Sequence, residues 1–284
     1  MRWADLDLLG HVNNVVYVDY LQEARVDLMR SQVSGARSAG LAEGIVVVRH
    51  EVGYRAPLLL DRGTVDIECW VTEVRPASFT MAYEVFHADA RDDTDNGRQV
   101  YLRAKTLLTP YVFATERPRR ITPDERTGLE LFLEPDDRVR PRPAPEIRRT
   151  EIGHWPVHVR FSDVDAYGHV NNVKYFEYFQ EGRISYVSRL WSGPSPHVTG
   201  MVVAQVDVDY RVPLVFRAEP YDLWSQVSRV GRRSISLEAA ICDGDTVCAA
   251  ATVVLVFWDP ATGRSVEPDP GVRALAEAQL RPVG

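Results

Sequence analysis

The chain has 284 residues, a length typical of about two domains, and 45% of its residues are hydrophobic, as in ordinary globular proteins. Its formal net charge is −7 and charges of both signs are interspersed, which argues against nucleic acid as the main partner. No apolar run reaches the roughly 18 residues of a membrane span, and no signal peptide precedes the first motif. We therefore expect a cytoplasmic protein without membrane insertion.

The three cysteines are expected to be buried thiols in a reducing compartment. Cys69, Cys242 and Cys248 are odd in number and lack the spacing of metal ligands. The sequence therefore predicts no metal site and no cofactor.

A polar motif occurs twice in the chain. Residues 3–17 read WADLDLLGHVNNVVY, and residues 161–175 read FSDVDAYGHVNNVKY. From Trp3 to Arg25, 13 of 23 positions are identical to those 158 residues further on. Most of the identities are polar residues or glycine, whereas a repeat retained only for packing would match mainly in its apolar pattern. The repeat therefore indicates a chemical role.

Each motif leads into a helical pattern. Apolar residues recur at three- and four-residue steps over 13–33 and again over 171–191, which predicts two long amphipathic helices. Asn13 or Asn14 is a candidate N-cap of the first helix, and Ser34-Gly35 is its expected end.

After each helix the hydrophobic period changes to two, which is typical of strands. Strands that follow a single helix indicate an antiparallel sheet with the helix on one face, an α+β fold. Asp92–Gly97 and Asp243-Gly244-Asp245 are expected to be hairpin turns. The predicted strands are Ile45–Tyr54, Thr64–Arg75, Phe79–Ala88, Gln99–Phe113, Met201–Tyr210, Tyr221–Val230, Ser234–Cys242 and Thr246–Trp258.

The repeat divides the chain into an N-terminal domain over 1–114, a Pro- and Arg-rich linker over 115–150 and a C-terminal domain over 151–284. Short helices are expected at 124–133, capped by Thr122 or Asp124, and at 271–280. An entry strand at 154–160 precedes the second motif, but only Met1 and Arg2 precede the first. Either the first domain has a truncated first strand or the chain starts downstream of the true start; we favour the second explanation.

The pattern Asp-x-Asp-x-x-Gly-His-Val-Asn-Asn-x-x-Tyr, followed by a long helix and an antiparallel sheet, resembles the hotdog-fold thioesterases. The most similar groups are the 4-hydroxybenzoyl-CoA thioesterase-like enzymes and the acyl-ACP thioesterases. The resemblance covers both halves and implies two hotdog domains in tandem, each a long helix wrapped by a sheet, paired as a pseudodimer with sites at the pair interface. It implies a thioester hydrolase acting on acyl-CoA or acyl-carrier thioesters, with a homodimer of tandem chains as a candidate assembly.

By this resemblance, Asp7 and Asp165 occupy the position of the catalytic carboxylate. A carboxylate there is compatible with direct attack on the thioester and with activation of water, and the sequence does not choose between them. The backbone amides of Asn14 and Asn172, seven residues later, would bind the oxyanion at the helix start. The alternative is that each Asp only caps a helix or turn.

The other motif residues have less specific expectations. His11 and His169 belong to the catalytic network by resemblance, with a purely positional role as the alternative. Asn13 and Asn171 are expected to hold the loop or cap the helix, and Gly10 and Gly168 to allow a turn or a close approach of substrate. The predicted substrate-binding set is Gly10, Asn13, Asn14, Gly168, Asn171 and Asn172.

Three further pairs are expected to be structural. Asp5 and Asp163 would bond loop amides, the helix tyrosines such as Tyr20 and Tyr178 would mostly pack, and Arg25 and Arg183 would form ion pairs near Glu23 and Glu181.

The sequence departs from the plant acyl-ACP pattern. An Asn expected two residues after the catalytic Asp is Leu9 in one half and Tyr167 in the other, and a Glu expected after Tyr-Arg is Pro57 and Pro213. These differences favour the simpler bacterial acyl-CoA thioesterase pattern. Two other functions stay open: a non-catalytic acyl-thioester binding protein, and a hotdog hydratase or dehydratase of enoyl thioesters.

Overall fold

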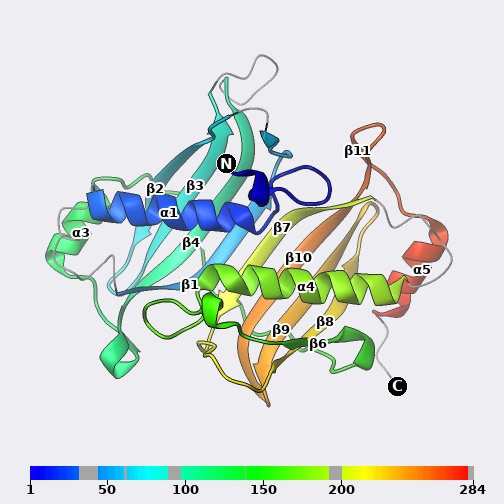
Figure 1. The fold of residues 1–284 in the computed structure, drawn as a ribbon. Helices are drawn as coiled ribbons and strands as arrows, with labels where there is room; N and C mark the ends of the chain where they lie inside the picture. The colour runs from blue at the N-terminus through cyan, green and yellow to red at the C-terminus, as the bar shows by residue number, and fades with distance from the viewer. Residues whose placement is uncertain (32–43, 61–62, 89–96, 138, 192–199, 281–284) are drawn as a thin grey trace. The chain divides into compact units, whose positions relative to one another are not determined.

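The computed structural model describes residues 1–31, 44–60, 63–88, 97–137, 139–191 and 200–280. The chain forms two compact units, Met1–Pro141 and Arg142–Gly284. In each unit one long helix lies across a face of an antiparallel sheet (Figure 1). We call them unit 1 and unit 2.

The described residues of unit 1 form four long strands in the spatial order β2-β3-β4-β1, with every neighbouring pair antiparallel. Helix α1 precedes this sheet in the chain, and α3 follows it. The elements are η1 (Trp3–Asp5), α1 (Val16–Ser31), β1 (Ile45–Tyr54), β2 (Asp66–Val74), β3 (Phe79–His87), β4 (Gln99–Val112), η4 (Phe113–Thr115), β5 (Arg117–Pro118) and α3 (Pro123–Glu130).

Unit 2 repeats this arrangement and adds a short strand, β6, which pairs with β8. Its order is β7-β10-β9-β8-β6. The elements are η5 (Glu151–Gly153), β6 (His154–Val157), η6 (Phe161–Asp163), α4 (Asn172–Leu190), β7 (Met201–Tyr210), β8 (Tyr221–Val230), β9 (Ser234–Asp243), β10 (Thr246–Asp259), β11 (Arg264–Ser265) and α5 (Pro270–Ala278).

The predicted elements are confirmed, and their bounds differ by a few residues. β1, β7 and β8 have the predicted ends, and the helix predicted over 171–191 begins at Asn172 and ends at Leu190. The expected entry strand is shorter than predicted and ends at Val157. The helix end expected at Ser34-Gly35 and most of the turn expected at 92–97 lie outside the described residues.

Hydrophobic burial holds each helix against its sheet. In unit 1, Val18, Leu21 and Met29 of α1 are at most 1% exposed, as are Val52 and Met81 of the sheet. Strand β3 is buried along almost its whole length, which requires cover on both faces of the sheet. No helix in the described part of the chain is long and apolar enough to cross a membrane.

The segment 115–150 is bonded to the sheets along much of its length. α3 begins with a capping box in which the Glu125 amide donates to Thr122 Oγ1 and the Thr122 amide donates to the Glu125 carboxylate. The Val71 amide of β2 donates to the Phe132 carbonyl at 2.8 Å. In unit 2, the Arg148 amide donates to Gln226 Oε1 of β8 at 3.0 Å. The boundary between the two units falls within this segment, at Pro141/Arg142.

We expect the Gly153→Ala variant to be destabilised by about 1–3 kcal/mol, because overpacking against a backbone atom cannot be relieved by a side-chain rotation. A Cβ at Gly153 would lie 2.3 Å from the Ser225 carbonyl oxygen of β8. Gly53→Ala in β1 is the control, because its Cβ would lie at an ordinary 3.6 Å from the Arg103 carbonyl oxygen. Urea unfolding monitored by circular dichroism measures both, and equal midpoints for the two variants would contradict the packing described here.

Candidate active site

The repeated motif folds into the same tight turn in both units. In unit 1 the Asp7 amide donates to the His11 carbonyl at 2.8 Å, and the Gly10 amide donates to the Asp7 carbonyl at 3.0 Å. The glycine has φ +75°, a conformation that a residue with a Cβ adopts only at a cost. The predicted role of Gly10 in a turn is therefore confirmed.

Unit 2 has the same geometry. The Asp165 amide donates to the His169 carbonyl at 2.9 Å, the Gly168 amide donates to the Asp165 carbonyl at 3.1 Å, and Gly168 has φ +81°. The motif Asp, Gly and His thus lie in one five-residue turn in each unit. An isolated β-bridge between the two residues that flank the turn closes it, Leu6 with Val12 in unit 1 and Val164 with Val170 in unit 2.

One carboxylate oxygen of each motif Asp is bound by its own loop. Asp7 Oδ1 accepts from the Leu9 amide at 2.9 Å and from the His11 amide at 3.3 Å. Asp165 Oδ1 accepts from the Tyr167 amide at 2.9 Å. Within the described part of the chain, the second oxygen of Asp7 and that of Asp165 accept no hydrogen bond. Both side chains are half-buried, so the turn fixes each carboxylate while leaving one of its oxygens available.

The residues after the turn begin the helix. Asn13 Oδ1 accepts from the Val15 amide at 3.0 Å, and Asn171 Oδ1 accepts from the Val173 amide at the same distance. The expected capping role is therefore confirmed for Asn171, the N-cap of α4. Asn13 lies three residues before α1 begins, and its side chain holds the loop that leads into the helix. The amide of Asn14, two residues before α1 begins, has no acceptor among the described residues.

Asn14 and Asn172 are also held through their backbone carbonyls. The Tyr54 hydroxyl of β1 donates to the Asn14 carbonyl at 2.6 Å, and the Tyr210 hydroxyl of β7 donates to the Asn172 carbonyl at 2.8 Å. The motif's helix start is thereby tied to the sheet at the same place in both units. The sequence signal for this contact is the Tyr-Arg pair that ends each of these strands.

His11 and His169 lie next to the carboxylate in the turn, and both are half-buried. No hydrogen bond joins the His11 ring to Asp7 in the part of the chain that the structure describes. No three His, Cys, Asp or Glu side chains of the described residues gather in a way that could hold a metal ion.

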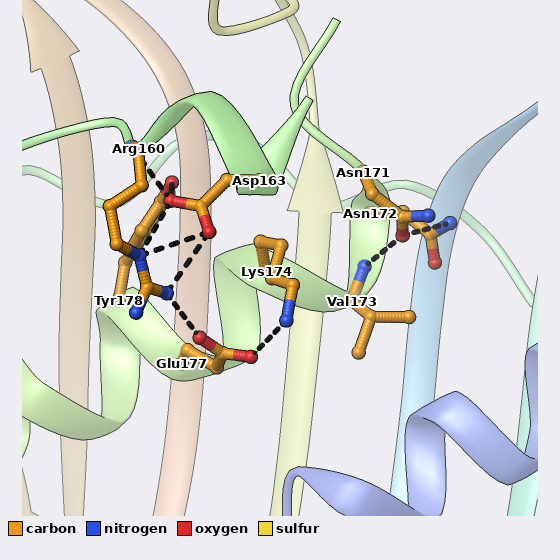
Figure 2. A network of polar contacts seen from close by, with 8 residues as sticks. All are labelled: Arg160, Asp163, Asn171, Asn172, Val173, Lys174, Glu177 and Tyr178. Atoms are coloured by element: carbon orange, nitrogen blue, oxygen red, sulfur yellow. Dashed lines mark hydrogen bonds and ion pairs between the residues drawn. The ribbon is translucent and has the colours of Figure 1, made fainter. Parts of the chain in front are cut away.

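A buried carboxylate anchors the base of each turn. Asp163 is 1% exposed and accepts from the Arg160 amide at 2.9 Å, from Arg160 Nε at 3.0 Å and from the Tyr178 hydroxyl of α4 at 2.7 Å (Figure 2). Arg160 Nη2 also donates to Glu177 at 2.6 Å, and Lys174 pairs with the same carboxylate. These contacts join η6, the motif loop and the first two turns of α4.

The same anchor is present in unit 1. Asp5 is 1% exposed, and it accepts from the Arg2 amide at 2.7 Å and from the Tyr20 hydroxyl at 2.5 Å. The predicted structural role of Asp5 and Asp163 is confirmed, but the prediction missed their partners. The signal was available, because Arg2 and Arg160 are related by the same offset of 158 as the rest of the repeat.

The electrostatics of the anchor keep the carboxylate charged. Burial by itself raises the pKa of Asp163, but the hydrogen bonds from Arg160 and Tyr178 and the charge of Arg160 outweigh it and lower the pKa below its ordinary value. Burial and the bond to Asp163 raise the pKa of Tyr178, so its hydroxyl remains a donor. The tyrosine was expected mostly to pack; it packs and also donates to the anchor.

We expect Asp163→Asn to lower the free energy of unfolding at pH 7 by about 1–3 kcal/mol, because a charged acceptor of several hydrogen bonds is lost. A carboxyl whose pKa is depressed in the folded state stabilises it above the unfolded pKa, and this contribution disappears as the pH falls through the folded pKa. The difference in the free energy of unfolding between Asp163→Asn and the unaltered chain should therefore become smaller below about pH 4.

Denaturant titrations over a pH series measure this difference. Glu181→Gln, which changes an exposed carboxylate of the same helix, is the control and should show no such pH-dependent difference. If the difference in the free energy of unfolding between Asp163→Asn and the unaltered chain stayed constant down to pH 2, the proposed stabilisation by the charged Asp163 would be contradicted.

Comparisons with known proteins agree with this geometry. A family model of the thioesterase-like superfamily matches residues 1–141 and 159–275. The chain is 36% identical over 112 residues to the uncharacterized protein YsmA of Bacillus subtilis (strain 168), a match that covers 39% of this chain and 75% of that protein.

Two solved structures share the fold along nearly the whole chain. A structure assigned as an oleoyl thioesterase from Lactobacillus plantarum has a TM-score of 0.69 and 17% identity, covering 91% of this chain and 94% of that one. The 12:0-ACP thioesterase from Umbellularia californica has a TM-score of 0.67 and 17% identity, covering 94% and 95%. With the repeated motif and the two helix-and-sheet units, these matches show that the chain belongs to the thioesterase-like superfamily, as a tandem hotdog thioester hydrolase.

Proposed function

We propose that the protein hydrolyses acyl thioesters of CoA or of a carrier protein to a carboxylic acid and a free thiol, with Asp7 and Asp165 as the reactive carboxylates. One observation carries the proposal above the others. In both units the motif Asp is fixed by amides of its own loop through one oxygen, while the other oxygen accepts no hydrogen bond from the described residues. Asp5 and Asp163 recur as well, but their carboxylates are buried and bound by an arginine and a tyrosine, whereas Asp7 and Asp165 are half-buried and keep one oxygen available.

Two routes are consistent with this carboxylate. In the first, its oxygen attacks the thioester carbonyl, the thiolate leaves, and water then hydrolyses the mixed anhydride. In the second, the carboxylate accepts a proton from water as the water attacks, and that proton passes to the departing thiolate. Both routes form the same acid and thiol and need no oxidant or reductant.

The helix start supplies the complementary half of the reaction. Negative charge develops on the carbonyl oxygen in either route, and the amide of Asn14, two residues before α1 begins, has no acceptor among the described residues. The positive end of the helix dipole favours that charge. Asn172 is the first residue of α4 and holds the same place in unit 2. His11 and His169, in the same turns, are proposed to orient the substrate or share a proton with the carboxylate.

Large hydrophobic side chains are exposed in the turns that carry the proposed carboxylates. Leu8 and Leu9 at the tip of the first turn are 106% and 65% exposed, and Tyr167 in the second is 39% exposed. Covering such surface is favourable, so these residues are suited to contact the acyl chain or the pantetheine arm of a substrate. The 12:0-ACP thioesterase among the similar structures bears the name of an acyl-carrier substrate, which supports carrier-bound as well as CoA-bound acyl groups as candidates.

The assembly implied by the resemblance also stays a proposal. It comprises pairing of the two units as a pseudodimer and a homodimer of tandem chains, and analytical ultracentrifugation of the full chain tests the second.

We expect the double variant Asp7→Asn plus Asp165→Asn to lose about 10²–10⁴-fold in kcat/KM, because an amide neither attacks the thioester nor accepts a proton from water. Thiol release from a panel of acyl-CoA and acyl-carrier thioesters measures it, and each single variant shows how much turnover its unit supplies. Asp27→Asn, an exposed carboxylate of α1 outside the motif, is the matched control.

Retained turnover in the folded double variant would overturn the assignment of the carboxylates. Tight binding of acyl-CoA without turnover by the unaltered chain would instead support a binding protein, and hydration of enoyl-CoA, followed by ultraviolet absorbance, would support a hydratase.

A further inference from the structure

The buried side of α1 carries a charged side chain, that of Arg25. Arg25 is 7% exposed and shares this side of the helix with Leu21 and Met29. Its Nη1 has no hydrogen-bond partner among the residues that the structure describes. Arg25 was expected to form a structural ion pair, but it forms none among the described residues, and the nearby Glu23 is exposed.

Three polar side chains of the sheet accompany this arginine inside unit 1. His50 and Thr106 are fully buried and Tyr83 is 1% exposed, and Thr106 Oγ1 lies 2.8 Å from His50 Nδ1. The Tyr83 hydroxyl donates to Met81 Sδ at 3.7 Å. Burial raises the pKa of Tyr83, and the positive charge of the nearby Arg25 acts in the opposite direction. We call these four residues, Arg25, His50, Tyr83 and Thr106, the Arg25 cluster.

Strand pairing explains how the sheet brings the cluster together. His50 of β1 lies opposite Thr106 of β4, and Tyr83 of β3 lies opposite Ala104, two residues earlier on β4. Side chains two residues apart on a strand share one face of the sheet. Three strands and the facing helix therefore direct polar groups into one region of the interior.

Unit 2 shows that the fold itself does not require these polar groups. Tyr54 and Tyr210 make the same contact to the helix start, so the two sheets can be matched residue by residue from that point. By this register, the positions of His50, Tyr83 and Thr106 are occupied in unit 2 by Val206, Ala239 and Val253. The interior of unit 2 is thus apolar where that of unit 1 is polar.

A buried guanidinium with an unmet donor is costly, and a carboxylate is the group that best matches it, through short charge-assisted hydrogen bonds. Arg25 lies nine positions after Val16, about 14 Å along α1 from the end where the proposed chemistry occurs. The distance suits the far end of an acyl group better than its thioester. Resting on the proposed thioesterase function, we propose that the Arg25 cluster binds a carboxylate at the far end of the acyl chain, so that the preferred substrates are thioesters of dicarboxylic acids.

Measuring the binding of substrate analogues tests the proposed carboxylate site without relying on turnover. Isothermal titration calorimetry of the full chain would use non-hydrolysable thioether analogues of acyl-CoA, in matched pairs of increasing length that end either in a carboxylate or in a methyl group. We expect the carboxylate member to bind at least about 10-fold more tightly once the chain is long enough to reach Arg25. Arg25→Met should remove the preference, and Arg25→Lys should keep part of it.

Two variants control for structure. Arg183→Met changes the equivalent helix position of unit 2 and should leave the preference intact. Tyr83→Phe keeps the ring volume and removes only the hydroxyl, so it should weaken the preference even if Arg25→Met fails to fold. Thermal unfolding of each variant establishes that it is folded before binding is compared.

Two results would refute the proposed carboxylate site. Equal binding of the two members at every length, or a preference that survives Arg25→Met, would refute the carboxylate site. If neutral acyl thioesters are nevertheless bound and hydrolysed, the proposed thioesterase function stands and only this inference fails. If neither analogue binds and no thioester is hydrolysed, both fail.

Discussion

The ion pair between an exposed arginine and a buried aspartate at the base of each motif is the interaction on which the rest of the candidate site depends. Arg160 and Asp163 are only three residues apart, yet the carboxylate is fully covered because Tyr178 of α4 closes over it. Breaking such a pair leaves a buried charge without a partner, so the loop cannot easily leave the helix. The turn that carries Asp165 is therefore fixed relative to the first turns of α4.

That constraint gives each motif residue a separate task. Asp163 fixes the loop, Gly168 provides the left-handed residue of the turn, and Asn171 caps the helix. Asp165 is then left with one oxygen that neither loop nor helix uses. The recurrence of this arrangement at Asp7 makes an accident of local geometry a poor explanation.

The two units have the same frame and different interiors. Both units share the contacts of the motif turn, of the asparagine after it, of the buried aspartate and of the sheet tyrosine. The residues of the sheet that face the helix differ between the units. His50, Tyr83 and Thr106 make the sheet side of unit 1 polar behind its helix, where unit 2 has valine and alanine on the matching strands. Once a chain carries two copies of a site, one interior can change without loss of the other, so a difference in substrate recognition is expected in the interiors before it appears in the loops.

Much of this was determined by the sequence alone. The period-two segments set the strands, and the doubled motif predicted both helices, the asparagine cap of α4 and the turn at Gly10 and Gly168, because these features depend on residues adjacent in the chain. Only the tertiary structure decided the partners of Asp5 and Asp163 and the burial of Arg25. The sequence placed Glu23 two residues from Arg25, but residues two apart on a helix do not face each other, and the helix turned one towards water and the other towards the sheet. The surroundings of Arg25 come from strands far along the chain, whose register is set by packing and strand pairing.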